Sequence, residues 1–370
     1  MNADRVSANW QVMEAAGGVS ADYHGRRLIR HFGDPAASYE AATSGAAVFD
    51  RSHRSRLVVT GRAPGQMLDG VLTGRMPAAP AEVGEHVLRG EATYHAVLTP
   101  KGRMISDLWA MLRGEEAAAG FLLDVPVAGS AALLEHFHKF LPPRLASVED
   151  VSATTAMISV VGPDAATLLS RLALGLQVGS DELSAMDEGE WRLTGVSVAD
   201  GLTVIKSDDV WPEAYSVVGP DTAVTALWKA VVAAGASPAG HGVWSTLRVE
   251  GGRPVFGTDM DDTTIPIEAG IHDRAIDYNK GCYTGQEVIV RIRDRGHVNR
   301  HLRRLRLGDV PTPPKGTELL AHDTDKVVGQ TTSAVQSPKY GETLALAYVR
   351  RGVESVTLDG SVIAVPPPDE

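Results

Sequence analysis

The proline-rich segment Val310-Pro311-Thr312-Pro313-Pro314 places the strongest constraint on how this chain can fold. Proline fixes φ and lacks a backbone N–H, so three prolines within four residues cannot continue a helix or a central strand. We therefore expect a domain boundary at residue 310. In residues 310–370, short apolar stretches such as 326–329 and 343–349 alternate with turn residues, which predicts a small β-barrel or sandwich.

Upstream of this boundary, strand-like and helix-like stretches alternate. An apolar strand, a turn built on glycine and a helical stretch follow one another three times, in residues 56–72, 156–172 and 215–234. This order predicts an α+β fold assembled from related units. The phosphate-binding patterns G-x-G-x-x-G and G-x-x-x-x-G-K-[ST] are absent from the sequence, which argues against the common nucleotide-dependent activities.

Charge and cysteine content narrow the function classes. The chain has 35 Lys and Arg against 46 Asp and Glu, a net charge of −11. This balance disfavours general binding of DNA or RNA, because neutralising phosphates requires a positive surface. The single cysteine, Cys282, excludes an intramolecular disulfide and a cysteine metal cage, and we expect no metal site. Residues 1–25 lack an apolar signal core and no run of about 18 apolar residues occurs, so we expect a cytoplasmic protein without a membrane span.

The segment around Cys282 is the first candidate for chemistry. Thr284 and Glu287 have the T-x-x-E spacing of a capping box before an apolar run, which predicts a helix start at Thr284. A thiol just upstream would feel the positive end of the helix dipole and the charge of Lys280, and both favour the thiolate. The alternative is that Cys282 is a small buried residue that only packs.

The second candidate is an arginine cluster. Residues 291–306 contain seven arginines and one aspartate. The functional interpretation is an anion site, for a polyglutamate tail, another carboxylate or an RNA phosphate. The alternative is a solvated face whose arginines pair with nearby carboxylates.

The third candidate is Asp107. A turn at Pro100-Lys101-Gly102 precedes a predicted strand that presents Asp107 among apolar neighbours. A carboxylate in such a place could orient an amine or accept its proton. The alternative is a structural aspartate held by hydrogen bonds.

Taken in order, these segments resemble the folate-binding aminomethyltransferase superfamily. That group contains the glycine-cleavage T-protein (GcvT) and the YgfZ-type proteins implicated in iron–sulfur cluster maintenance and tRNA modification. Residues 31–61 are similar to the superfamily's opening, residues 247–254 to its T-L-R-x-E-x-G-x-P element, and residues 332–349 to its C-terminal barrel. The octapeptide from Lys280 to Glu287 resembles K-G-C-Y-x-G-Q-E, the signature of the YgfZ-type subgroup.

The resemblance implies an α+β, three-domain GcvT-like ring of mixed and antiparallel sheets with flanking helices, plus a small C-terminal β-barrel. Tetrahydrofolate would bind in the central channel. The implied divisions are 1–240 for the folate-binding region, with interleaved subdomains 1–60 plus 150–240 and 61–149, then 241–309 completing the α+β core around the signature and 310–370 for the barrel.

The resemblance also implies site residues. In T-proteins a carboxylate of the glycine-turn motif lies near the reactive folate nitrogen, and this sequence has Ser106-Asp107 where T-proteins typically have Asp-Asp. Glu213 corresponds to the pterin-binding glutamate. The catalytic candidates are Cys282 and Asp107, and the implied cofactor-binding set is Glu213, Arg248, Lys280, Tyr283 and Arg291.

Three hypotheses about function follow. The first is a tetrahydrofolate-binding YgfZ-type protein that acts through Cys282 in iron–sulfur cluster assembly or repair, with tRNA modification as a further role. The second is a folate-dependent aminomethyltransferase or demethylase, in which Asp107 positions the amine and tetrahydrofolate takes the one-carbon unit. The third, ranked last because of the net charge, is an RNA-binding module formed by Arg291 to Arg306. The expected partners are folate and, under the first hypothesis, iron–sulfur proteins or their assembly factors and tRNA.

Overall fold

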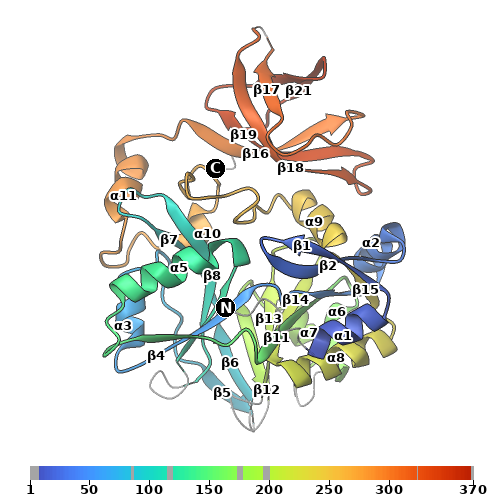
Figure 1. Ribbon diagram of the computed structural model, residues 1–370, viewed down its shortest axis with the longest axis vertical. Helices are drawn as coiled ribbons and strands as arrows, with labels where there is room; N and C mark the ends of the chain where they lie inside the picture. The colour runs from blue at the N-terminus through green and yellow to red at the C-terminus, as the bar shows by residue number, and fades with distance from the viewer. Residues whose placement is uncertain are drawn as a thin grey trace.

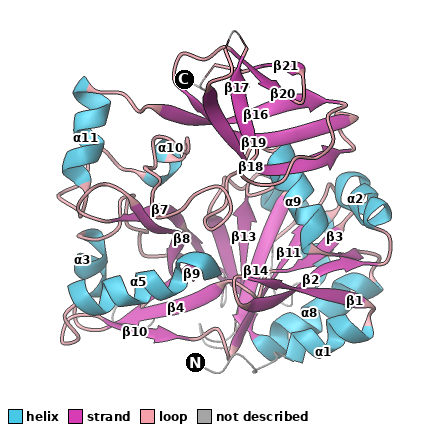
Figure 2. Cartoon of the chain, turned by 45° about the horizontal axis from the view of Figure 1, so that its top comes forward, coloured by secondary structure: helices cyan, strands magenta, loops and turns pink. Residues whose placement is uncertain are grey.

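Three large sheets and one hairpin organise the protein (Figures 1 and 2). The computed structural model describes residues 8–84, 87–114, 120–172, 178–194, 201–322 and 324–367. Helices pack on the faces of the sheets, so the expected α+β fold is confirmed.

None of the described helices is long and apolar enough to cross a membrane. The helices are α1 (Ala8–Ala15), α2 (Pro35–Ser44), α3 (Pro64–Asp69), α5 (Val127–Phe140), α6 (Ala165–Leu172), α7 (Ser180–Ser184), α8 (Asp221–Ala233), α9 (His241–Glu250), α10 (His272–Ala275) and α11 (Gln286–Arg295).

The largest sheet has eight strands. Their order is β15 (Ser237–Ala239), β3 (Ala47–Asp50), β11 (Thr155–Val161), β14 (Ala214–Pro220), β13 (Leu202–Ser207), β12 (Glu190–Thr194), β6 (Val87–Glu91) and β5 (Ala81–Gly84). Among the described strands of this sheet, only β15 and β3 pair in parallel. Helices α1, α6, α7 and α8 bury one face through apolar side chains such as Trp10, Leu169, Tyr215 and Leu227. All three strand–turn–helix units expected from the sequence are confirmed: β11 with α6 and β14 with α8 in this sheet, and β4 (Ser55–Thr60) with α3 in the next one.

The second sheet is antiparallel and has five strands. Their order is β10 (Ser147–Asp150), β4 (Ser55–Thr60), β9 (Phe121–Val125), β8 (Met104–Leu112) and β7 (Thr93–Leu98). Its outer face is an apolar core under α3 and α5, which contains Leu108, Leu123 and Phe137. Its inner face meets the eight-stranded sheet through Met111 and Trp191 among others. The two sheets thus pack face to face, and the site lies between them.

The third sheet, at the top of Figure 1, contains β16 (Arg300–Gly308), β19 (Glu342–Arg350), β18 (Val327–Ser337), β17 (Glu318–Ala321), β20 (Ser355–Leu358) and β21 (Ser361–Ala364), in that order. It curls into a half-barrel, whereas the sequence analysis expected a small β-barrel or sandwich. No ladder joins β16 to β21 in the described residues, and prolines at 366 and 367 end the short β21.

The proline-rich segment does not mark the start of this sheet. Strand β16 pairs with β19 before the prolines are reached, so the sheet begins at Arg300. The prolines connect β16 to β17 within one sheet. Because prolines lack a backbone N–H, they are found here in the connection between two strands of one sheet and do not separate two domains.

A buried ion pair ties the third sheet to the rest of the protein. Arg248, on α9, donates from Nη1 to Asp259 Oδ2 at 2.7 Å and from Nη2 to Ser333 Oγ of β18 at 2.7 Å. Asp259 also accepts hydrogen bonds from Thr332 and from the backbone of Val255. The Asp259 side chain is fully buried and that of Arg248 is 6% exposed. Every charged atom of the aspartate is therefore satisfied inside the protein.

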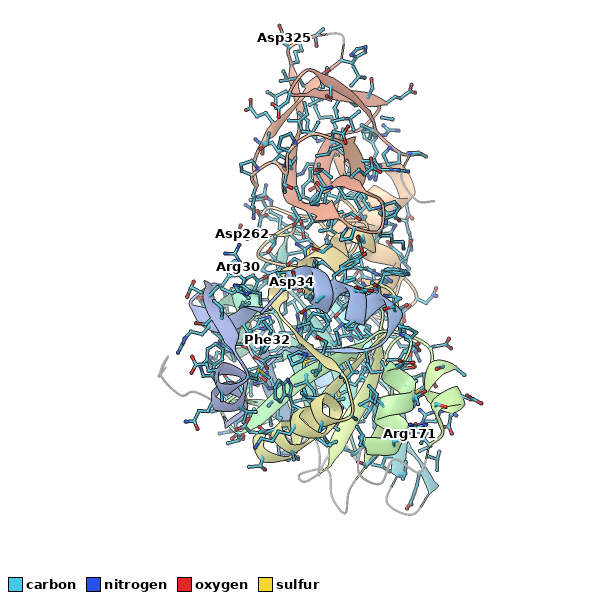
Figure 3. All side chains as sticks on the ribbon, turned by 90° about the vertical axis from the view of Figure 1, so that its right-hand side faces the viewer. Arg30, Phe32, Asp34, Arg171, Asp262 and Asp325 are labelled. Atoms are coloured by element: carbon cyan, nitrogen blue, oxygen red, sulfur yellow. The ribbon has the colours of Figure 1, made fainter. Side chains whose placement is uncertain are left out.

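We expect Asp259→Asn to lower the free energy of unfolding by about 3–5 kcal/mol, because it leaves the buried Arg248 cation without its counter-charge. Urea unfolding would measure the loss. Asp262→Asn is the matched control, since Asp262 is exposed three residues away (Figure 3) and should change the value by less than about 0.5 kcal/mol. Equal stability of the two variants would contradict a stabilising role for the pair.

Candidate functional site

The polar residues of the site lie on the inner face of the five-stranded sheet. Side chains alternate along a strand, so Ser106 and Asp107 of β8 point to opposite faces. Ser106 points outward to the first turn of α5, where a Cβ atom at Gly129 would lie 2.2 Å from Ser106 Oγ. Asp107 therefore points inward. The serine at position 106 removes no carboxylate from the inner face.

Asp107 is buried, with 7% of its surface exposed. Tyr94 of β7 donates its hydroxyl hydrogen to Asp107 Oδ2 at 2.5 Å. Asp107 Oδ1 is also buried, and it has no hydrogen-bond partner among the described residues. Because a buried, unpartnered carboxylate oxygen is costly, this atom calls for a functional explanation.

Tyr94 connects Asp107 to a pocket of about 500 Å³. The pocket wall includes the rings of Tyr94 and Trp109, whose centroids are 5.3 Å apart. The guanidinium of Arg274 lies 4.8 Å from the Tyr94 ring centroid, and Glu188 holds it through a hydrogen bond of 3.1 Å from Nε. The pocket thus offers aromatic faces for a flat ligand and a cation fixed in place.

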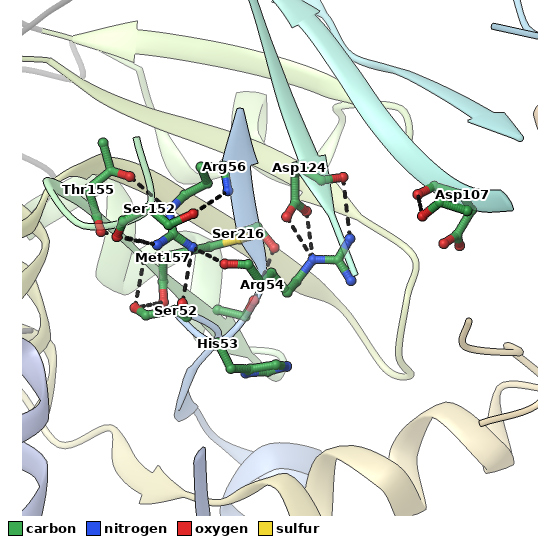
Figure 4. A network of polar contacts seen from close by, with 12 residues as sticks. Ser52, His53, Arg54, Arg56, Asp107, Asp124, Ser152, Thr155, Met157 and Ser216 are labelled. Atoms are coloured by element: carbon green, nitrogen blue, oxygen red, sulfur yellow. Dashed lines mark hydrogen bonds and ion pairs between the residues drawn. The ribbon is translucent and has the colours of Figure 1, made fainter. Parts of the chain in front are cut away.

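A buried ion pair lies next to Asp107 on the same face (Figure 4). Arg54 donates from Nε to both carboxylate oxygens of Asp124, at 2.7 and 2.9 Å. The nearby Arg56 is 1% exposed and donates to Thr155 Oγ1 and to the carbonyls of Arg54 and Ser152. Both arginines are therefore satisfied by the protein itself.

Burial raises the pKa of Asp107, while the hydrogen bond from Tyr94 and the charge of Arg54 oppose this rise without cancelling it. Burial and the Asp107 charge together raise the pKa of Tyr94 well above its ordinary value. Tyr94 consequently stays a protonated donor, and Asp107 is a carboxyl that takes up a proton more readily than a surface aspartate.

Glu213 forms a second polar cluster. Its Oε1 accepts a hydrogen bond from Tyr215 at 2.6 Å and another from Lys206. The Glu213 side chain keeps 23% of its surface exposed. Within the described part of the chain, no hydrogen bond joins this cluster to Asp107.

Lys280, the first residue of the signature octapeptide, holds the rim of the pocket. Its Nζ donates to the carbonyls of Leu72 and Gly74, at 2.8 and 2.9 Å, and pairs with Asp69 at 2.9 Å. Gly74 and Asn279 both line the pocket. The ammonium is therefore engaged by the protein and positions the rim.

The helix after the signature begins at Gln286, so the expected start at Thr284 was wrong. Gly285 occupies the N-cap position with φ 86°, and no side chain caps the helix. A Cβ atom at position 285 would lie 2.7 Å from the carbonyl oxygen of Thr99, which only glycine avoids. Cys282 is exposed and precedes the N-cap of α11, outside the first helical turn, so the helix dipole acts on it weakly.

Among the described residues, no hydrogen bond joins the remaining expected residues to Asp107. Tyr283 is buried with an unpartnered hydroxyl, and burial raises its pKa to about 12. Arg248 is engaged by Asp259 and Ser333. Arg291 is exposed on α11. The structure therefore groups Asp107 with residues that were not singled out beforehand.

The arginine cluster is divided between two elements. Part of it lies on α11 and part on β16. Several members pair with carboxylates, in the pairs Arg293–Asp294, Arg300–Glu268 and Arg306–Glu342. For these arginines, the alternative interpretation as a paired surface describes the structure.

The sequence analysis missed Tyr94, Trp109, Arg54, Asp124 and Arg274. One signal was available, because Trp109 follows Asp107 by two residues and therefore shares its face of the strand. Tyr94 and Asp124 are cross-strand neighbours of Trp109 in the register. No local pattern indicates that register, which depends on how three strands pair.

Asp107→Asn should unfold at a higher temperature than the unsubstituted protein at pH 7. A raised pKa in the folded state means that the ionised carboxylate weakens folding above its ordinary pKa, and asparagine removes that charge while still accepting from Tyr94. The difference should vanish below about pH 4, where the carboxyl is protonated in both states. Thermal unfolding at several pH values would measure it.

Asp124→Asn is the matched control on the same face. It should lower the unfolding temperature at pH 7, because Arg54 loses its buried counter-ion. If Asp107→Asn were destabilising to the same degree, Asp107 would be a structural aspartate like Asp124.

Comparisons with known proteins agree with this architecture. The family model described as the GCVT N-terminal domain matches residues 10–280. An aminomethyltransferase of Rubrobacter xylanophilus is 29% identical over 341 residues, covering 90% of this chain and 84% of that protein. One of Neisseria meningitidis is 28% identical over 356 residues, covering 94% and 90%. The crystal structure of the glycine cleavage system aminomethyltransferase T from Bartonella henselae has the same fold, with a TM-score of 0.79, 18% identity, and coverage of 96% and 94%. The family match over most of the chain shows that this protein belongs to the GCVT family of the aminomethyltransferase superfamily.

Proposed function

We propose that this protein transfers a one-carbon unit from an amine donor to tetrahydrofolate. The observation that carries the proposal is the buried Asp107 carboxyl, with one oxygen held by Tyr94 and the other without a partner, beside an aromatic pocket. The names of the family's relatives give the reaction type, since the similar proteins reported above are aminomethyltransferases.

The chain's own residues suit this chemistry. Tyr94 fixes Asp107 Oδ2, so that Oδ1 keeps one direction in which to accept an N–H hydrogen bond. Because burial raises it, the pKa of Asp107 lies closer to neutral pH than that of a surface aspartate, which favours exchange of a proton with an amine nitrogen. Asp107 can thus orient the amine and hold its proton.

The pocket also fits a reduced folate. The rings of Tyr94 and Trp109 present apolar faces against which a flat bicyclic ring can pack. The unpartnered Oδ1 of Asp107 gives such a ligand's N–H an acceptor. When bound, tetrahydrofolate supplies the nitrogen that accepts the one-carbon unit. We assign Glu213 as a further acceptor for ring N–H groups, and we propose that the three sheets surround a common channel.

This proposal adopts the second of the three hypotheses from the sequence. None of the relatives reported above is named for iron–sulfur assembly or tRNA modification. The signature around Cys282 remains the support for the first hypothesis, and the exposed thiol gives it a direct test. The paired arginines of residues 291–306 give no support to the third hypothesis.

Asp107→Asn should reduce one-carbon transfer about a hundredfold or more, because general acid–base groups contribute about 10²–10⁴ in rate. In the unsubstituted protein, the acidic limb of the pH–rate profile should lie above the usual aspartate pKa of about 4, since burial raises the pKa of Asp107. The assay follows formation of the one-carbon derivative of tetrahydrofolate from aminomethyl and N-methyl donors.

Ser106→Ala is the control for that experiment. Its hydroxyl faces α5 on the other side of β8, so the variant should keep its transfer rate. Full activity of Asp107→Asn would refute the assigned role.

Cys282→Ala should transfer one-carbon units at a rate within about twofold of the unsubstituted protein, because its side chain is exposed and does not line the pocket. The same transfer assay measures it. An alkylating reagent should modify Cys282 in the folded protein without loss of transfer. A variant that binds tetrahydrofolate normally but has lost transfer would contradict this expectation and give Cys282 a part in the transfer itself.

A further inference from the structure

Arg51, Arg54 and Arg56 lie within six residues but differ in their hydrogen-bond partners. Arg54 pairs with Asp124, and Arg56 donates to backbone carbonyls and a hydroxyl. Arg51 is also buried, with 5% of its surface exposed, but its Nε and Nη1 have no hydrogen-bond partner among the described residues. Of the three, Arg51 is the one whose guanidinium has buried nitrogens without a hydrogen-bond partner among the described residues.

The surroundings of Arg51 are aromatic. Its guanidinium lies 3.6 Å from the ring centroid of Trp244 on α9. The rings of Tyr23, His53 and His241 form a cluster beside it, with centroids 4.9–5.5 Å apart. Burial and the charge of Arg51 lower the pKa of both histidines, so neither adds a positive charge at neutral pH. Stacking on Trp244 stabilises the cation only in part.

Arg51 is linked to the neighbourhood of Asp107 through Arg54. The backbone carbonyl of Arg51 accepts a hydrogen bond from the backbone N–H of Arg54 at 3.1 Å. The side chain of Arg54 pairs with Asp124, next to Asp107 (Figure 4). Among the described residues, no ion pair joins Arg51 to Asp107.

We propose that Arg51 binds the carboxylate of a ligand whose amine nitrogen lies at Asp107. A buried guanidinium whose Nε and Nη1 lack partners matches a carboxylate, because an anionic oxygen accepts a charge-assisted N–H hydrogen bond more strongly than a neutral one. The proposal rests on the proposed function, which supplies the amine at Asp107. The carboxylate has two sources, an N-substituted amino acid that serves as the donor or the glutamyl group of tetrahydrofolate. Because Arg51 Nε and Nη1 are buried, we expect a neighbouring aromatic side chain to change its rotamer when the ligand binds.

Calorimetric titration of the full chain tests this with paired probes. N-methylglycine is compared with dimethylamine, which lacks the carboxylate, and tetrahydrofolate with 6-methyltetrahydropterin, which lacks the benzoylglutamate. Arg51→Gln should weaken binding of one carboxylate probe about tenfold or more and leave its carboxylate-free counterpart unchanged. The pair of probes in which Arg51→Gln weakens binding identifies the source of the carboxylate, the amine donor or tetrahydrofolate. Arg171→Gln, on the outer surface of α6 (Figure 3), should change neither.

The free protein gives a second readout. Arg51→Gln should raise Tm in the absence of ligand, because it removes an unpaired buried charge, whereas a structural arginine would lower it. Arg51→Lys keeps the charge without the planar guanidinium and should bind with intermediate affinity. The proposal is overturned if folded Arg51→Gln binds both carboxylate probes normally, if the unsubstituted protein binds neither, or if both substitutions prevent folding. Normal transfer that depends on Asp107 would leave the proposed function standing in each case.

Discussion

The Arg248–Asp259 ion pair is the interaction on which the arrangement of the sheets depends. Its arginine lies near the C-terminal end of α9, and its hydrogen bond to Ser333 reaches the third sheet. Two residues later on the same helix, Glu250 accepts hydrogen bonds from Tyr39 of α2 and from Ser337. The other end of α9 supplies His241 and Trp244 to the aromatic cluster around Arg51. One helix therefore holds the third sheet at one end and completes the polar interior at the other.

The five-stranded sheet separates an apolar core on its outer face from polar residues on its inner face. Asp107 and Leu108 are adjacent on β8, yet Leu108 belongs to the outer apolar core and Asp107 to the inner polar face. Strand alternation separates the two by the thickness of one sheet. The carboxyl can consequently be buried and its pKa raised without opening the core that holds the sheet together. A one-residue slip of register would exchange these faces.

Much of the fold could be predicted from the sequence, because strand–turn–helix units are local patterns. β11 with α6 and β14 with α8 lie where apolar runs and Gly-Pro-Asp turns indicate them. The helix after Cys282 was misplaced because the close approach of Gly285 to Thr99 is a tertiary constraint. Asp107 could be singled out, but Tyr94 and Asp124 could not, since only strand register brings them together. Arg248 belongs to a recognisable element, although its contacts are structural.

The unpaired groups of the interior favour one ligand type over another. A fold that needed only stability would pair the buried carboxyl of Asp107 with the buried guanidinium of Arg51, as it pairs Arg54 with Asp124. Keeping an anionic acceptor and a cationic donor apart in one region is costly in the free protein. A ligand that carries both an amine and a carboxylate neutralises both groups at once, whereas a simple amine leaves Arg51 uncompensated. If Arg51 binds a ligand carboxylate as proposed, the electrostatics of the free protein favour a ligand that carries both an amine and a carboxylate, and the cost of the two unpaired groups contributes to specificity for it.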